Sequence, residues 1–317
     1  MGWDKLNCLW YHYKWLYRQI LIRLTGKPPA LKRYLGKQIM SRQETNDCLR
    51  SLIVKGKPFM AGRLGSVELK AMRKLELPYL PSNLPGKKSA VINLCRNAGF
   101  FPEDIALERK FCQLMKQSCG QLDLAGVWFN PMEDYFLGRY GQPGLNMGLL
   151  GGLEPWYSEQ PWTELLEGKR VMVIHPFAET IEEQYKKREK IFPGTRILPE
   201  FRLYTVKAVQ TIAGVRDDRF ANWFEALEWM FREAMKVPFD IAVIGCGAYG
   251  FPLAARLKAA GKMSVHLGGA SQLLFGIKGK RWDEDPNVSR YYNDYWVRPS
   301  RREKPESAAV IEDACYW

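Results

Sequence analysis

The sequence predicts an α/β protein with a Rossmann-like, mainly parallel sheet, helices on both of its faces and a helical N-terminal extension. An apolar stretch at residues 240–244 leads into the pattern Gly245-x-Gly247-x-x-Gly250, which is followed by a helical pattern and by a second apolar strand at residues 263–267. Strand and helix patterns alternate in this way through the C-terminal half, which is typical of parallel strands joined by right-handed crossovers.

The N-terminal extension is predicted to be an amphipathic helix over residues 3–24, because apolar side chains recur there at spacings of three and four. They are Trp3, Leu6, Trp10, Tyr13, Tyr17, Ile20 and Leu24. The segment also carries four cations, Lys5, Lys14, Arg18 and Arg23, against the single acid Asp4. Such a helix either lies on an anionic membrane surface or packs on its own domain or a sister subunit, and the sequence leaves both open.

The central domain is expected at residues 30–285, between the helix of residues 1–29 and a polar, basic tail at 286–317. Its first half reads as one or two basic helices at 30–57, a strand at 58–63, mostly helix at 64–125 with loops at 78–88 and near 99–102, and a strand at 124–129. Residues 130–161, rich in Gly, Pro and aromatics without a clear period, suggest a long functional loop or lid. Strands at 169–175 and 195–198 and helices at 179–191 and 223–235 complete the pattern.

Composition limits the compartment and the partners. The chain has 317 residues, with 47 Lys and Arg against 34 Asp and Glu, and this net charge of +13 favours binding of phosphates, nucleic acid or anionic lipid. No nucleic-acid-binding signature accompanies the charge, so nucleic acid is not the expected partner. Seven cysteines without a C-x-x-C pair, together with three histidines, argue against a zinc site and suit a reducing cytoplasm. Charges interrupt the N-terminal segment too often for a membrane span or a secretory core.

The glycine pattern has the strand-to-helix context of a nucleotide-phosphate loop. Gly245 would allow the tight turn, Gly247 the approach of a phosphate and Gly250 the close packing of the helix, whose N-terminal N–H groups would then face the anion. A dinucleotide site also needs an acid about 20 residues on, where this chain has His266 to Ala270, so NAD is not the expected ligand. The alternative is that the glycines serve only a tight turn.

Two segments resemble the glycosyltransferases of the GT-D fold, which act in bacterial surface polysaccharide and glycan biosynthesis. The first is Gly62-Arg63-Leu64-Gly65-Ser66-Val67-Glu68, similar to that family's Arg-x-Gly-Asp-x-Glu loop, and the second is residues 239–282, which resemble its Rossmann-like half. The resemblance spans about residues 58–285 and implies sugar transfer from a nucleotide-activated donor, with a divalent metal bridging the diphosphate.

One departure from that family concerns the metal. Ser66 stands where the family has Asp, so only Glu68 matches the carboxylates of its motif. Glu68 and a diphosphate could hold Mn²⁺ or Mg²⁺ loosely, since such cations want several oxygen ligands. Without a metal, Lys278, Lys280 and Arg281 could neutralise the leaving diphosphate instead.

The candidate catalytic residues are Glu68, Arg63 and His266. Arg63 could grip a phosphate or form a structural ion pair, and Glu68 could be a metal ligand, a general base or an ordinary acid at a helix start. His266 and, less directly, His175 end strands at the edge where ligands gather. Further donor-binding candidates follow from the two segments: Gly65, Ser66, Gly245, Gly247, Tyr249, Gly250, Gly268, Gly269, Gln272, Lys278, Lys280 and Arg281. Glu133 and Asp134 could supply the missing carboxylate, and Tyr249 could stack on a base or pack on its helix.

The sequence therefore predicts a cytoplasmic glycosyltransferase, peripheral to the membrane if its N-terminal helix binds lipid. Its donor would be a nucleotide diphosphate sugar, with a UDP-sugar favoured, and its acceptor a bacterial surface glycan or a lipid-linked sugar. A non-catalytic nucleotide-binding or scaffold protein and a nucleotide-dependent oxidoreductase are the alternatives. The oligomeric state stays open.

Overall fold

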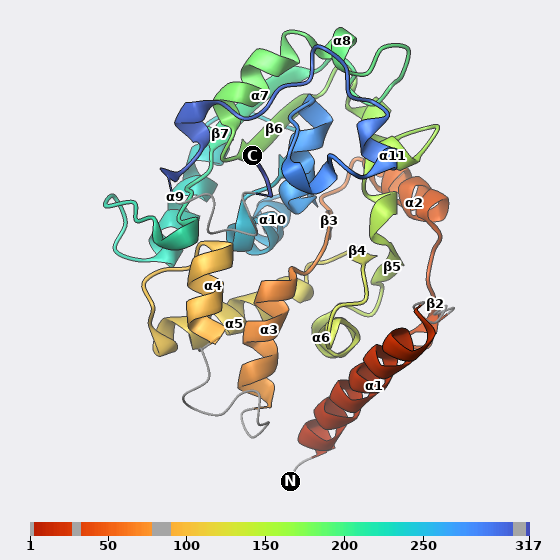
Figure 1. Cartoon of the computed structure of the whole chain (residues 1–317), viewed down its shortest axis with the longest axis vertical. Helices are drawn as coiled ribbons and strands as arrows, with labels where there is room; N and C mark the ends of the chain where they lie inside the picture. Colours follow the sequence, from red (N-terminus) through yellow and green to blue (C-terminus); the bar gives the residue numbers. More distant parts are fainter. Residues whose placement is uncertain (1–2, 27–32, 78–89, 307–314) are drawn as a thin grey trace.

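A seven-stranded sheet forms the centre of the molecule, seen in a computed structural model that describes residues 3–26, 33–77, 90–306 and 315–317 (Figure 1). All of its strand pairs are parallel, in the order β5-β4-β3-β9-β8-β6-β7. The strands are β3 (Met60–Gly62), β4 (Leu124–Val127), β5 (Asn146–Leu149), β6 (Arg170–His175), β7 (Arg202–Lys207), β8 (Ile241–Ile244) and β9 (Met263–His266). A separate antiparallel pair joins β1 (Arg33–Tyr34) to β2 (Lys37–Gln38).

Helices cover both faces of the sheet. They are α1 (Trp3–Thr25), α2 (Arg42–Lys55), α3 (Ser66–Glu76), α4 (Ala90–Ala98), α5 (Ile105–Cys119), α6 (Glu133–Tyr140), α7 (Ala178–Tyr185), α8 (Arg188–Ile191), α9 (Trp223–Met235), α10 (Gly250–Ala259) and α11 (Pro286–Ser289). One core cluster joins the sheet to α3, α4, α5, α9 and α10, and a second joins its other face to α2, α7 and the 3-10 segment Gly268–Phe275. The predicted α/β class, with helices on both faces and an N-terminal helix, is therefore confirmed.

The strand sequences explain this double-sided core. In β6, Met172 and Ile174 belong to one cluster, whereas Val171 and Val173 belong to the other. All four are at most 1% exposed, as expected for a parallel strand that is covered on both faces. Such strands read as continuous apolar runs, which is why the sequence pattern located β6, β8 and β9.

Capping residues set the ends of the covering helices. Ser41 and Glu44 form a capping box at the start of α2, and Gly56 ends that helix in the left-handed conformation. Asn222 caps the backbone N–H groups of Phe224 and Glu225, so α9 begins at Trp223 as the pattern predicts.

Three predictions from the sequence are wrong. Residues 30–57 contain the β1–β2 pair before α2, rather than helix throughout. Residues 195–198 form an irregular bend, in which the Thr195 hydroxyl donates to the carbonyl of Phe192 and accepts from the N–H of Ile197. The neighbouring strand is β7, which begins at Arg202. The helix expected at 179–191 is two helices, α7 and α8. The loop expected at 78–88 lies outside the described residues.

The lid expected at residues 130–161 is also wrong. This stretch forms α6, the edge strand β5 and short 3-10 turns, and its Met132, Leu145 and Met147 are buried in the core. Its glycines serve close packing, since a Cβ atom at Gly148 or Gly152 would collide with Thr45 on α2. Glycines used in this way hide the period-2 pattern of a strand.

Candidate functional site

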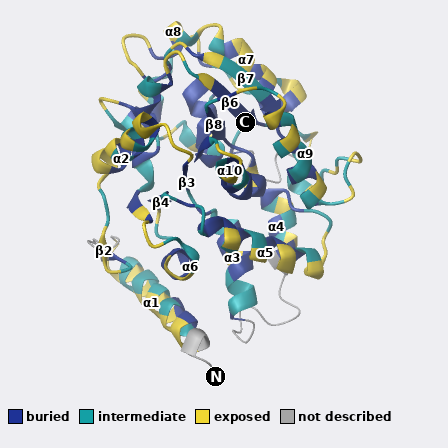
Figure 2. Cartoon of the chain, turned by 180° about the vertical axis from the view of Figure 1, so that it is seen from behind, coloured by how far each residue is buried: buried dark blue, intermediate teal, exposed yellow. Residues whose placement is uncertain are grey.

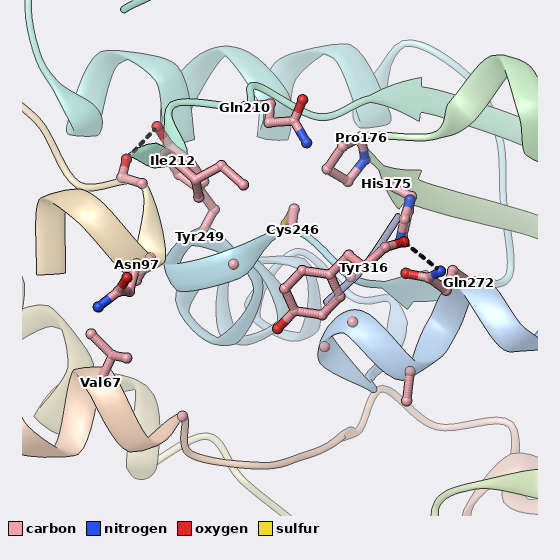
Figure 3. A pocket seen from close by; sticks show the side chains of 18 of the residues that line it. Val67, Asn97, His175, Pro176, Gln210, Ile212, Cys246, Tyr249, Gln272 and Tyr316 are labelled. Carbon is pink, nitrogen blue, oxygen red and sulfur yellow. Dashed lines mark hydrogen bonds between the residues drawn. The ribbon is translucent and has the colours of Figure 1, made fainter. Parts of the chain in front are cut away.

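A pocket of about 470 Å³ opens at the carboxyl edge of the sheet. Its lining comes from the segments that follow β3, β4, β6, β7, β8 and β9. In Figure 3, Val67 of α3 and Asn97 of α4 lie at one end of the pocket, and Pro176 and Gln210, which follow β6 and β7, lie at the other. Ligands of open α/β sheets bind at this edge, where neighbouring connections leave in opposite directions. Here the connection from β6 leads to β7 at the edge of the sheet, whereas the connection from the neighbouring strand β8 leads to β9 towards the centre of the sheet.

The pocket brings together most of the residues that the sequence singled out. Its lining includes Arg63, Gly65, Ser66, Glu68, His175, Gly245, Gly247, Tyr249, His266, Gly268, Gly269, Gln272 and Arg281. It does not include Gly250, Lys278 or Lys280. The Lys278 Nζ instead lies 5.0 Å from the centre of the Tyr292 ring. The two segments that carry the family resemblance thus meet in one cavity.

Arg63 is one of the two arginines that line the pocket. Its guanidinium lies 5.1 Å from the centre of the Trp128 ring, and a Cβ atom at Gly268 would collide with it. The indole N–H of Trp128 donates to the carbonyl of Leu64, which holds that ring in place. No carboxylate in the described part of the chain forms an ion pair with Arg63. A planar fork fixed in this way has its donors available for a phosphate.

Glu68 lies in the first turn of α3 and is 9% exposed. Burial raises the pKa of its carboxyl, whereas a hydrogen bond to its own backbone N–H and the charge of Arg63 lower it. The carboxylate folds back over Gly65, where a Cβ atom would lie 2.5 Å from its Cδ. Gly65 therefore sets the position of Glu68, and the position of this acid at a helix start also stabilises α3.

The glycine loop is shaped mainly by packing. A Cβ atom at Gly245 would meet Ser271 and the ring of His175, and one at Gly250 would meet the ring of His266. Gly247 has a φ of +55°, so any side chain there strains the backbone whether or not a phosphate approaches. The close packing expected at Gly250 is thus visible, whereas Gly245 is needed for close packing and has no positive φ that a tight turn would demand. The role of Gly247 in phosphate approach stays a prediction.

Both histidines of the pocket are buried and neutral. Burial lowers the pKa of His175 to about 3, and its Nδ1 accepts the backbone N–H of Phe177, so Nε2 carries the proton. Burial, together with the charge of Arg63, lowers the pKa of His266 to about 3. The Nδ1 of His266 is buried without a hydrogen-bond partner. Each ring can therefore exchange hydrogen bonds with a ligand, but neither supplies a positive charge at neutral pH.

Tyr249 and Gln272 form part of the pocket wall. The Tyr249 ring stacks on Trp223 at 4.8 Å, and its hydroxyl lies 3.0 Å from that of Thr211, so it packs inward in the free protein. The amide nitrogen of Gln272 donates to the carbonyls of Ile277, Lys278 and Tyr316, and Figure 3 draws the bond to Tyr316. Its Oε1 is buried with no partner, which leaves one acceptor at the pocket wall.

The lining residues that were not singled out from the sequence include four with large aromatic or acidic side chains. Trp128 and Glu154 fall near or inside the stretch expected to be a lid, and Tyr316 and Trp317 fall in the segment expected to be a polar tail. The Arg281 guanidinium lies 4.9 Å from the centre of the Tyr316 ring. Periodicity could not indicate these residues, because they reach the pocket only through the tertiary fold.

Glu154 is the second carboxylate of the pocket. Burial raises its pKa to about 7, and the positive charge of Arg63 acts against that rise. Glu133 and Asp134, which the sequence offered as alternative sources of a carboxylate, lie in α6 beneath α1 and do not line the pocket. Glu133 accepts the backbone N–H groups of Trp128 and Phe129, and burial raises its pKa to about 8.

A metal would have few protein ligands here. No group of three or more His, Cys, Asp or Glu side chains that could hold an ion occurs among the described residues. Glu68 and Glu154 are the two carboxylates lining the pocket. A divalent cation would therefore need the oxygens of a bound phosphate to complete its shell.

Comparisons with known proteins return two solved structures. No protein-family model matches the chain, and neither does any curated protein. One structure is described as showing that the highly conserved domain of unknown function 1792 has a distinct glycosyltransferase fold, and the other is a selenomethionine-substituted structure of that domain. Their TM-scores are 0.46 and 0.45, each at 12% identity, with 84% of this chain and 96% of the other covered. What this pocket can do therefore has to follow from its own residues.

Proposed function

We propose that this protein transfers a sugar from a nucleoside diphosphate sugar to an acceptor hydroxyl. The observation that supports it most is the fixed Arg63 guanidinium, without an ion-pair partner in the described chain, in a pocket that also holds two carboxylates. Arg63 and Arg281 would bind the diphosphate and stabilise the negative charge that grows on it as it leaves. The glycine turn before α10 would add backbone N–H groups at a helix start.

The transfer needs one base and one leaving group. The acceptor oxygen attacks the anomeric carbon, the bond from that carbon to the diphosphate oxygen breaks, and the diphosphate leaves with the bonding electrons. The hydroxyl proton passes to a carboxylate. Glu154 suits this role, because a pKa of about 7 lies near a neutral working pH. Glu68 would then orient the donor beside Arg63.

A UDP-sugar is the favoured donor. The unpartnered Oε1 of Gln272 is an acceptor in the pocket wall, and uracil presents an imide N–H that such an acceptor can bind. The exposed edge of the pocket would admit the acceptor, for which we propose a bacterial surface glycan or a lipid-linked sugar on the cytoplasmic side.

Metal dependence has two alternatives. With Mn²⁺ or Mg²⁺, Glu68 would hold the ion together with the diphosphate oxygens, and without it Arg63 and Arg281 alone would neutralise the leaving group. Turnover in EDTA compared with turnover in added Mn²⁺ separates them.

Thermal shifts with UDP, GDP, CMP and NAD test the proposal, because a ligand selective for the folded state raises the melting temperature. We expect a nucleoside diphosphate, UDP first, to stabilise the wild type, and this shift to disappear in Arg63→Ala. Stabilisation by NAD alone would favour an oxidoreductase and overturn the proposal. Stabilisation by UDP without turnover of any UDP-sugar would favour a non-catalytic nucleotide-binding protein.

A further inference from the structure

Helix α1 has apolar side chains on two faces, and its own domain covers one of them. On the covered face, Cys8 is 1% exposed and His12 is 6% exposed. The Tyr11 ring packs edge-on against Tyr135 at 5.8 Å. Contacts with charged groups hold the same side, since Lys14 pairs with Asp134 at 3.2 Å and Arg18 lies 4.4 Å from the centre of the Phe129 ring. The docking of α1 on α6 is thus accounted for without its other face.

The other face is an exposed apolar row, which we term the outer seam. Its members and their exposed fractions are Leu6 50%, Trp10 66%, Tyr13 58%, Leu16 37%, Tyr17 64%, Ile20 53% and Leu24 78%. The other large apolar side chains exposed in the described chain are Val54, Ile92, Ile105, Trp128, Met235 and Tyr295, which are scattered over several elements. Figure 2 shows exposed residues along α1 at the periphery of the molecule. A continuous apolar row of this size marks an interaction surface.

The charge of α1 distinguishes between the occupants that could cover this seam. From Lys5 to Gly26 the chain has no Asp or Glu, and Arg23 is exposed in the last turn. Two copies of α1 packed along the seam would have no Asp or Glu after Asp4 to pair with Arg23, whereas paired helices are usually held by opposite charges beside the seam. An anionic lipid surface complements Arg23, and Trp and Tyr side chains favour the boundary between headgroups and acyl chains.

The described helices also limit how α1 could meet a bilayer. None of them combines the length and the apolar character that crossing a membrane requires. One face of α1 is committed to the domain, so the helix can present only the outer seam. A helix in this position lies along the lipid surface with its apolar side chains among the headgroups.

We propose that the outer seam of α1 binds the surface of an anionic bilayer, with the helix axis along that surface. The inference does not depend on the sugar-transfer proposal, because it uses only α1 and its contacts. It would hold the whole domain at a lipid surface, whatever ligand the pocket takes.

Vesicle sedimentation with the full chain tests it. We expect binding to phosphatidylcholine vesicles that contain phosphatidylglycerol, weakening as salt rises, and at least about tenfold weaker binding to phosphatidylcholine alone, which corresponds to about 1.4 kcal/mol. The double variant Trp10→Ser with Tyr17→Ser should lose at least about tenfold in affinity for the anionic vesicles. The control, Val54→Ser with Ile105→Ser, removes equally exposed apolar side chains elsewhere and should bind as the wild type does.

Three results would overturn the proposal. The first is that the wild type does not bind anionic vesicles, and the second is that the seam variant binds them as tightly as the control does. The third is that light scattering shows a dimer for the wild type and a monomer for the seam variant, which would assign the seam to a second copy. Melting curves must match between variant and wild type. If the double variant melts early, the single variant Tyr17→Ser replaces it, and an affinity equal to that of the wild type would count against the proposal.

Discussion

Substitution of Gly65 offers a sharp test of Glu68, because it moves the carboxylate without removing it. Gly65 has φ −73° and ψ 147°, a conformation that alanine adopts freely. A Cβ atom there would lie 2.5 Å from Cδ and 2.8 Å from Oε1 of Glu68, against about 3.5 Å for an ordinary contact. The carboxylate must therefore shift by about 1 Å. A shift of that size in a catalytic group can lower turnover about 100-fold, which corresponds to about 2.7 kcal/mol of activation free energy.

Two further variants separate this effect from lost stability. Alanine in place of glycine at a helix N-cap costs up to about 1 kcal/mol of unfolding free energy, whereas serine supplies a capping oxygen. Gly65→Ser should therefore unfold like the wild type in urea and still turn over about 100-fold more slowly, since it carries the same Cβ. Gly144→Ala, whose Cβ would meet nothing within 4 Å, should change neither property. Wild-type turnover by folded Gly65→Ala would refute the role of Glu68.

Substitutions at three other positions probe the pocket and the packing around it. Arg63→Ala should weaken UDP binding by about 10- to 100-fold in calorimetry. Arg63→Lys should restore only part of the lost affinity, because an ammonium lacks the planar pair of donors of a guanidinium. Wild-type affinity in the lysine variant would contradict bidentate binding. If Glu154 is the base, turnover should rise with pH through about 7 as its carboxyl ionises, and Glu154→Gln should abolish this rise of turnover with pH. Since its folded pKa is raised, Glu154 favours folding at low pH, and this contribution is lost as pH rises from about 4.5 to about 7; melting of the glutamine variant should lack that trend. Gly250→Ala should cost about 1–3 kcal/mol in urea unfolding, because its Cβ would collide with the buried His266 ring, and wild-type stability would contradict that packing.

Sequence patterns located the elements whose burial is continuous or strongly periodic. The buried runs of β6, β8 and β9 and the amphipathic α9 were found within a few residues, since each carries its own signal. Strand β7 was missed because it lies at the sheet edge and is largely half-exposed, so its apolar content is low. Strand β5 was missed because Gly148 is needed to admit Thr45.

In the candidate site, too, the residues that belong to short motifs could be predicted, and those brought in by tertiary packing could not. Arg63, Glu68 and the glycine turn were identified from short motifs, because each acts through a local backbone geometry. Glu154 and Tyr316 were not, since only the packing of distant segments brings them to the pocket. The raised pKa of Glu154 has its cause in burial, which no local pattern records. Whether these residues act on a sugar nucleotide stays a prediction.

Donor turnover is the measurement that tests the central proposal most directly. Purified protein would be incubated with UDP- and GDP-sugars, with water as the slow default acceptor, and release of the nucleoside diphosphate would be followed over time. We expect at least one UDP-sugar to be cleaved by the wild type, and its cleavage to fall about 100-fold in Gly65→Ala while Gly144→Ala matches the wild type. Cleavage of none of these donors, or cleavage that Gly65→Ala leaves unchanged, would contradict sugar transfer in this pocket.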